Sequence, residues 1–204
     1  MRTLRGLYRG LEALYGADSG VDPVDFLVPF APRGAADELV LVREGDDGEV
    51  EIGLALADRA LDRLEANHGA ALADAALADT LPVVEGLSHL LYLVEAVRRE
   101  RPVSGLELET QAEVDKLALC LLGRWPPPEQ DFARLVDRIF CQWQLLPGLG
   151  AELRERYCTA NRVALGFARR LERPVRARQL GPLRRALRGF WAEDMDGKRA
   201  LARA

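Results

Sequence analysis

Two long apolar runs of helical period, which together occupy residues 80–122, constrain the fold of this chain most strongly. Five residues that include Pro102 and Gly105 separate the runs, and this breaker predicts two helices rather than one. A connection of that length makes the two helices antiparallel neighbours. The first run repeats its apolar residues at intervals of three and four, as one face of a helix requires: Val83, Val84, Leu87, Leu90, Leu91, Val94 and Val97.

Short polar signals mark where these two helices begin. Thr80 is a residue type that caps helices, and Pro82 fits the first helical turn. Ser104 stands in the equivalent capping place before the second run. We therefore expect one helix to begin at Thr80 and the other after Gly105, with Ser104 as its cap.

The N-terminal quarter of the chain combines a helix with strands. Residues 2–15 repeat leucine on one face and predict an amphipathic helix, which we expect to dock on its own domain rather than on a membrane. Residues 38–43 are rich in Val and Leu, residues 49–54 alternate apolar and polar side chains, and together they predict an antiparallel β-hairpin. Residues 25–30 predict a short edge strand, because Pro29 argues against a central one.

Helical periodicity dominates the chain from residue 56 onward. Besides the central pair, we expect helices over residues 129–146 and 151–172, and Pro174 should end the second of these. A last helix that begins near Pro182 should lead into a frayed terminal segment.

These patterns predict a mainly α fold of the α+β class, a multi-helix domain with a small antiparallel β-hairpin near the N-terminus packed on the helices. The length of 204 residues suits a single domain over residues 1–204. Within it we expect an N-terminal helix plus β-hairpin over residues 1–55, a helical body over residues 56–146 and basic C-terminal helices over residues 151–204.

Composition favours a soluble cytoplasmic protein. Hydrophobic residues make up 49% of the chain and charged residues 29%, which is typical of a globular protein with a sizeable core. We find no apolar run long enough to span a bilayer and no secretory signal, so we expect no membrane partner. The three cysteines are far apart and odd in number, so we interpret them as reduced core residues: Cys120, Cys141 and Cys158.

Charge is distributed unevenly along the chain. The net charge is −4, yet residues 151–191 hold eleven arginines and three glutamates, a net charge of +8. Such a section can neutralise phosphates, and its candidate nucleic-acid-binding residues are Arg162, Arg169, Arg173, Arg184 and Arg188. Aromatic residues are poorly interleaved with these arginines and the chain as a whole is acidic, so we favour a contact within the protein or between subunits over nucleic acid.

The strong catalytic motifs are missing from the sequence. It has no glycine-rich phosphate loop, no Cys-x-x-Cys and no His-Glu-x-x-His. Residues 86–90 begin like the nucleophile elbow of a hydrolase, but the second glycine is missing and no strand precedes them. Ser88 and His89 are adjacent on a helix, so their side chains diverge, and we exclude a serine hydrolase.

Two pairs of side chains in the central helices have the spacing of metal ligands. Glu85 and His89 are four residues apart, and so are Glu109 and Glu113, so each pair can present two ligands to one point. Facing helices with such pairs share the general geometry of carboxylate–histidine metal sites in helix bundles, although those sites use Glu-x-x-His. The metal-site hypothesis therefore takes Glu85, His89, Glu109 and Glu113 as ligands.

A structural interpretation of the same residues is commoner. Glu85 and His89 would form a hydrogen-bonded pair, Glu109 would be solvated, and Glu113 would pair with Lys116 or with an arginine. A third interpretation is catalytic. Glu113 interrupts an apolar seam, an environment that suits a general acid or base, and His89 would be its partner in catalysis.

Three hypotheses for the function follow from these observations. The first is a non-catalytic cytosolic interaction or regulatory protein, without a cofactor, whose partner is another protein or a second copy of the chain. The second is an enzyme, for example a metal-dependent hydrolase, that uses the Glu/His cluster and a metal ion. The third is nucleic-acid binding through the C-terminal arginine-rich helices.

Overall fold

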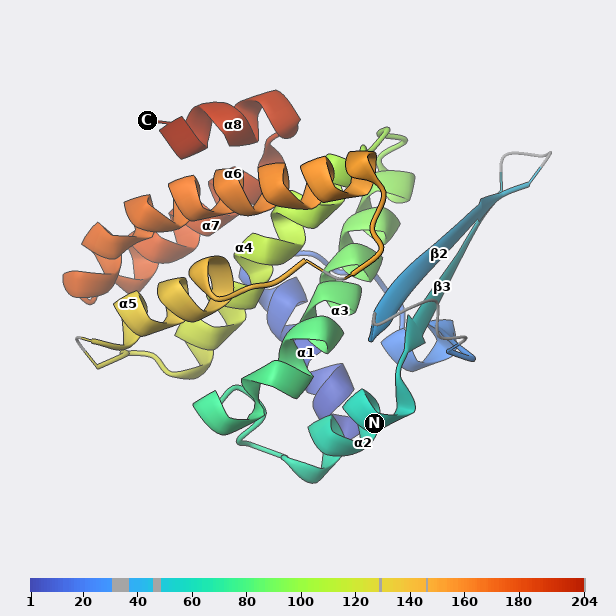
Figure 1. The fold of residues 1–204 in the computed structure, drawn as a ribbon, viewed down its shortest axis with the longest axis horizontal. Coiled ribbons are helices and arrows are strands. Elements are labelled where there is room, and N and C mark those ends of the chain that lie inside the picture. The colour runs from blue at the N-terminus through green and yellow to red at the C-terminus, as the bar shows by residue number, and fades with distance from the viewer. Residues whose placement is uncertain (31–36, 46–48, 129, 146, 204) are drawn as a thin grey trace. The chain divides into compact units, whose positions relative to one another are not determined.

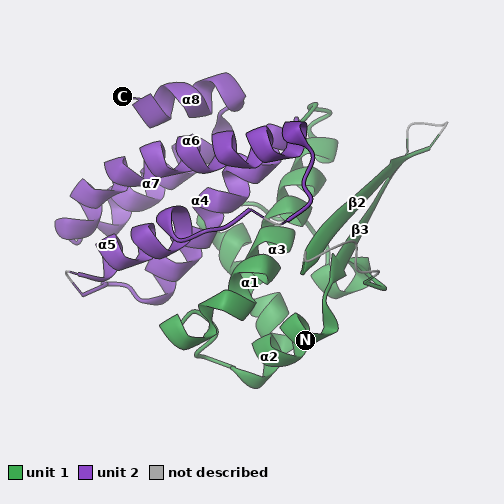
Figure 2. Ribbon diagram, in the orientation of Figure 1, with its two compact units in different colours: residues 1–103 green, residues 104–204 purple. Residues whose placement is uncertain are grey.

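The computed structural model describes residues 1–30, 37–45, 49–128, 130–145 and 147–203 (Figure 1). The chain forms two compact units, Met1–Val103 and Ser104–Ala204 (Figure 2). Helices dominate both units and the only sheet of the described residues lies in the first, so the predicted mainly α class is confirmed. That both units belong to one domain stays a prediction.

The first unit is built around its last helix. Helix α3 contacts the other two long helices of the unit and both long strands, and its side chains are buried on most sides. In chain order the elements are α1 (Arg2–Tyr15), the short helix η1 (Pro23–Phe26), β1 (Leu27–Val28), β2 (Glu38–Glu44), β3 (Val50–Leu56), α2 (Asp58–Ala66), η2 (Asp74–Ala76) and α3 (Leu77–Arg98).

Helix α1 docks on its own unit, as its leucine stripe predicts. It contacts α2 and α3, and it buries Leu4, Leu7, Tyr8, Leu11 and Leu14. Its N-terminus is capped by Glu65 of α2, whose carboxylate accepts hydrogen bonds from the backbone N–H groups of residues 2, 3 and 4 at 2.8, 3.2 and 3.0 Å. A side chain from a neighbouring helix thus satisfies three N–H groups that α1 cannot pair internally.

The sheet is mixed rather than a simple hairpin. Strands β2 and β3 pair antiparallel, from Glu38 opposite Leu56 to Glu44 opposite Val50. Strand β1 is the predicted short edge strand, and it pairs parallel with β3, which gives the order β1-β3-β2. The prediction of a small antiparallel hairpin is therefore incomplete, and most of its turn, residues 46–48, lies outside the described residues.

Helix α3 corrects two sequence predictions. It begins at Leu77, and Thr80 lies inside it, where the hydroxyl donates a hydrogen bond to the Ala71 carbonyl at 2.7 Å instead of capping the helix. Contrary to the expectation from the sequence, the segment Asp74–Arg98 is long and apolar enough to cross a membrane by length and composition. Within this segment, 72% of the most apolar window is buried, as is typical of a core helix in a soluble protein.

The described part of the second unit contains helices and the loops that join them, without a strand. Helix α6 packs along α4, and α8 packs on α6. Ser104 caps α4 as predicted, because its hydroxyl accepts a hydrogen bond from the Glu107 N–H at 3.2 Å. The elements are α4 (Gly105–Gly123), α5 (Asp131–Val136), the π-helical turn η3 (Asp137–Cys141), α6 (Ala151–Arg176), α7 (Leu180–Ala192) and α8 (Met195–Arg203).

The predicted helix over residues 129–146 is shorter than expected. Its regular part ends at Val136, and the π-helical turn that follows is closed by Gln142. The backbone N–H of Gln142 donates to the Asp137 carbonyl at 3.0 Å, and its side-chain amide donates to the Asp137 carboxylate at 2.6 Å. Cys141 is exposed at the end of this turn, so the prediction of a core position is wrong for it but holds for the buried Cys120.

The C-terminal helices also differ from the sequence prediction. Helix α6 continues through Pro174 to Arg176, because the proline lies near the end of the helix and the buried Val175 beyond it keeps the last turn packed. The terminal segment is an ordered helix, α8, rather than a frayed one. Its Lys198 is fully buried and donates a hydrogen bond to the Phe190 carbonyl at 2.6 Å, so it caps the C-terminus of α7.

Candidate functional site

A carboxylate–imidazole pair lies where the sheet of the first unit meets α3. His89 is 6% exposed, and its Nδ1 lies 3.3 Å from Oε1 of Glu38, the first residue of β2. Gly86, one turn before His89, makes this approach possible. A Cβ at that position would lie 2.7 Å from Cδ1 of Leu54 and 2.8 Å from Cγ of Glu38, so a larger residue would force these strand side chains to shift.

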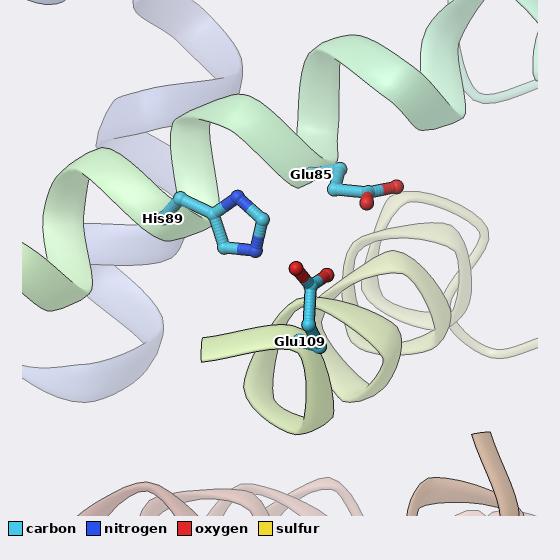
Figure 3. A group of neighbouring side chains, drawn as sticks. All are labelled: Glu85, His89 and Glu109. Carbon is cyan, nitrogen blue, oxygen red and sulfur yellow. The ribbon is translucent and has the colours of Figure 1, made fainter. Parts of the chain in front are cut away.

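Glu85 and His89 follow each other by one turn on α3, and their side chains lie on the same side of the helix (Figure 3). Glu85 is half-buried and His89 buried. A carboxylate and an imidazole at this spacing can bind one ion together. Because Glu38 contacts Nδ1, Nε2 is the ring nitrogen that faces such an ion, with a carboxylate behind the imidazole as in many metalloproteins.

The two predicted ligands on α4 differ in their surroundings. Glu113 forms an ion pair with Lys116, its Oε1 lying 2.6 Å from Nζ, so this part of the structural interpretation is confirmed. Glu109, which Figure 3 also labels, is half-buried one turn before Glu113. The hypothesis that both pairs bind one ion joins residues of both units, and it stays a prediction.

Sequence reasoning missed Glu38 as a contact of His89. The two residues are 51 positions apart, and no local spacing rule links them. The one available signal was Gly86, because a glycine inside an otherwise apolar helix lowers helix stability and is consistent with close packing at that position. It predicts that something packs closely against α3, although it does not predict which strand residue does so.

A buried polar pair on α4 also escaped the sequence reasoning. Gln111 and Asp115 are both fully buried, and the Gln111 amide donates a hydrogen bond to the Asp115 carboxylate at 2.9 Å. The sequence contains their spacing of four residues, but the apolar residues around them do not indicate which side of the helix faces inward. The burial of both side chains therefore could not be predicted. A hydrogen-bonded amide and carboxylate of this kind stabilise the helix and do not by themselves indicate catalysis.

The predicted nucleic-acid-binding arginines are all exposed in the second unit. Three lie on α6 and two on α7: Arg162, Arg169, Arg173, Arg184 and Arg188. Arg162 lines a groove together with Arg199 and Arg203 of α8, whereas Arg173 lines a second groove with other neighbours. The arginines therefore belong to separate surface features, and their role in binding nucleic acid stays a prediction.

Exposed apolar side chains gather on the strands of the first unit. Leu39, Leu41 and Val42 of β2 and Val50 of β3 are 36%, 46%, 53% and 36% exposed. The far ends of the two strands extend beyond the helices of this unit (Figure 2). Strand β2 forms one edge of the sheet, and β3 is the only strand paired with it among the described residues.

Comparison with known proteins gives no relative from which a function could be carried over. No family model, curated protein or solved structure matches the chain. The interpretation of its sites therefore depends on their geometry and chemistry.

Proposed function

We propose that the chain is a non-catalytic interaction protein that binds an extended segment of a partner protein along the edge of β2. The observation that carries the proposal is an edge strand that is long, apolar and exposed. Residues 39–42 read Leu-Val-Leu-Val, without a charge or a proline. Natural sheet edges are usually protected from pairing by lysine, proline, a bulge or a covering segment.

The side chains of β2 favour an extended partner. Successive side chains of a strand point to opposite faces, so Leu39 and Leu41 lie on one face of the sheet and Val42 on the other. An added strand would gain backbone hydrogen bonds along the edge and apolar contacts on both faces, which is how β-strand addition achieves affinity. The predicted partner is therefore an extended segment with apolar residues at alternate positions.

Charge further restricts the partner. Arg43 pairs with Glu51 across the strands at 2.6 Å, which leaves Glu44 as the acidic group at the far end of β2. A basic residue opposite Glu44 would complement it, since opposite charges across a strand pair are favourable. A second copy of β2 fits less well, because antiparallel pairing centred on Leu41 places Glu38 opposite Glu44. Like charges directly opposite each other destabilise such a pair.

The test uses the whole chain and a synthetic peptide in which valine and threonine alternate between terminal lysines. Fluorescence anisotropy should show binding to the unmodified protein. The double substitution Leu41→Lys and Val42→Lys should weaken it by about tenfold or more, because it places two charges on the edge. The control is Val97→Lys, an apolar residue of α3 that is 45% exposed and lies outside the sheet. It should leave binding unchanged.

Three results would contradict this proposal. The first is that the unmodified chain does not bind the peptide, and the second is that the control variant loses as much affinity as the double variant. The third comes from sedimentation velocity: self-association that the double substitution abolishes would assign the edge to a second copy of the chain. Circular dichroism of each variant establishes that the fold is retained.

The pair formed by Glu38 and His89 favours a second candidate function, binding of a divalent metal by Glu85 and His89. Calorimetric titration of the whole chain with Zn²⁺ should show a site that His89→Ala abolishes. Glu38→Gln should weaken it by roughly 10- to 100-fold, as removal of a histidine's outer partner does elsewhere. His68→Ala removes the chain's other histidine and serves as the control. Equal affinity in all variants would exclude this site, and with it the metal-dependent hydrolase.

A further inference from the structure

A groove of about 510 Å³ opens on the second unit where α6, α7 and α8 meet. Its volume falls within the usual range for small-molecule sites. The groove is lined by apolar residues, three arginines and a glutamine: Phe167, Pro174, Pro182, Ala186, Gly189, Leu201, Arg170, Arg173, Arg185 and Gln179. None of its residues belongs to the sheet edge or to the Glu/His cluster.

The apolar part of the groove is held rigidly. Phe167 is buried, and its ring stacks on Phe190 with the centroids 4.2 Å apart and the planes inclined by 27°. Leu201 of α8 is fixed from the other side, because its carbonyl accepts a hydrogen bond from the Arg170 guanidinium. A ligand in this groove would therefore contact apolar side chains that neighbouring residues hold in place.

The charged part of the groove is positive throughout. Among the residues that the structure describes, no acidic side chain lines it. Glu172, the nearest acid to Arg173 in the sequence, pairs with Arg176 at 2.8 Å. Three guanidinium groups around one groove repel one another, and an anion bound among them relieves that repulsion.

The start of α7 adds a second positive feature at the same place. Gln179, the residue that precedes α7, and Pro182 of its first turn both line the groove, and that turn carries no acid. Nη1 of Arg185 lies 3.6 Å from the point that a Cβ on Gly181 would occupy, so this guanidinium lies over the same turn. A cation beside the positive end of a helix is unfavourable. An anion bound at this place is stabilised by the guanidinium and by the helix N-terminus together.

We propose that this groove binds a small organic anion, a phosphate or carboxylate group on a compact apolar body. The arginines and the first turn of α7 bind the anionic group, and Phe167 and Leu201 contact the apolar body. The site is independent of the strand-binding edge, so either proposal can fail without the other.

Calorimetry on the whole chain tests the proposal with four probes: phenyl phosphate, benzoate, inorganic phosphate and benzyl alcohol. Phenyl phosphate or benzoate should bind, and the stronger of the two identifies the anionic group. Inorganic phosphate should bind more weakly than phenyl phosphate, because it lacks the apolar body. Benzyl alcohol should not bind, because it lacks the charge. Absence of binding by both phenyl phosphate and benzoate would overturn the proposal.

Paired variants separate the groove from diffuse positive charge. Arg173→Gln with Arg185→Gln should weaken binding by about tenfold or more. The control is Arg169→Gln with Arg184→Gln, which removes the same charge from exposed positions on the same two helices, four residues before Arg173 and one before Arg185, outside the groove. It should change the affinity by no more than about twofold, as expected for screened surface charges.

A further variant tests the groove without removing an arginine. Ala186→Glu places an acid among the lining residues and should abolish binding of the organic anion while circular dichroism shows an unchanged fold. Equal losses in the two arginine pairs would overturn the proposal and favour a dispersed phosphate-binding surface. A single-stranded oligonucleotide that binds the unmodified chain, and binds both double arginine variants more weakly, would identify that outcome.

Discussion

Glu65 is the residue whose contribution to stability is defined most clearly by its contacts. Burial tends to raise the pKa of its carboxyl group. The hydrogen bonds from Leu4, Thr3 and Arg2 and the contact with the terminal ammonium group outweigh that effect and hold the pKa below its ordinary value. A carboxylate with a lowered pKa stabilises the fold at pH values above its unfolded pKa. This stabilisation is lost as the pH falls through the lowered, folded value.

We therefore expect Glu65→Gln to lower the free energy of unfolding by about 1–2 kcal/mol at neutral pH, the range for a lost helix cap or charged hydrogen bond. The difference from the unmodified chain should shrink as the pH falls below the ordinary glutamate range. Urea denaturation followed by circular dichroism measures it. Asp62→Asn, an exposed acid on the same helix, is the control and should show no such trend. A difference that is constant with pH would contradict the assignment.

Local signals predicted some residue roles and missed others for a physical reason. Ser104 was predicted as a cap because its partner lies three residues away, within the reach of a sequence rule. Thr80 has the same residue type, but its partner is the Ala71 carbonyl, nine residues earlier in a loop. The contact of Glu38 with His89 depends on how a strand packs on a helix, which the sequence pattern does not encode.

At the scale of elements, the packing of the sheet on α3 depends on Gly86. Its missing side chain accommodates Leu54 of β3 and Glu38 of β2. Alanine normally stabilises a helix relative to glycine by about 1 kcal/mol. At this position the added methyl group would lie under 3.0 Å from side chains of both strands, and overpacking of this kind costs about 1–3 kcal/mol.

We expect Gly86→Ala to lower the free energy of unfolding and Gly6→Ala to raise it. Gly6 lies inside α1, and a Cβ there would meet nothing within 4 Å, so only the gain in helix propensity remains, about 0.5–1 kcal/mol. The two variants carry the same chemical change and should shift the denaturation midpoint in opposite directions. If both stabilise the chain, the close contact between α3 and the sheet is not a constraint.

Element types were predicted better than element ends. Period 3.6 identified α3, α4 and α6, because each buries a continuous set of apolar residues. The end of α6 was placed too early, since Pro174 suggested a stop that the packing of Val175 overrides. Sequence periodicity does not predict that α8 is ordered, because α8 is held by its packing on α6 and by the hydrogen bond of Lys198 to the end of α7.

At the scale of the whole molecule, composition and periodicity were sufficient for the mainly α class but not for the sheet topology. Strand β1 contains only two residues, too few to show any alternation, so its parallel pairing with β3 could not be read from the sequence. For the candidate site, the sequence placed Glu85 and His89 on one face of one helix. It did not reveal the strand that orients the imidazole, because that strand is distant along the chain.

The burial of Lys198 and Lys116 has a consequence for the chemistry of the protein surface. They are the only lysines in the chain; Lys198 is inaccessible, and Lys116 is 8% exposed and held by Glu113. Almost every cationic side chain that solvent meets is therefore a guanidinium. Acetylation, ubiquitin attachment or crosslinking at lysine would require local unfolding first. The rate of lysine modification would therefore measure how often the helices open, and not how exposed the folded surface is.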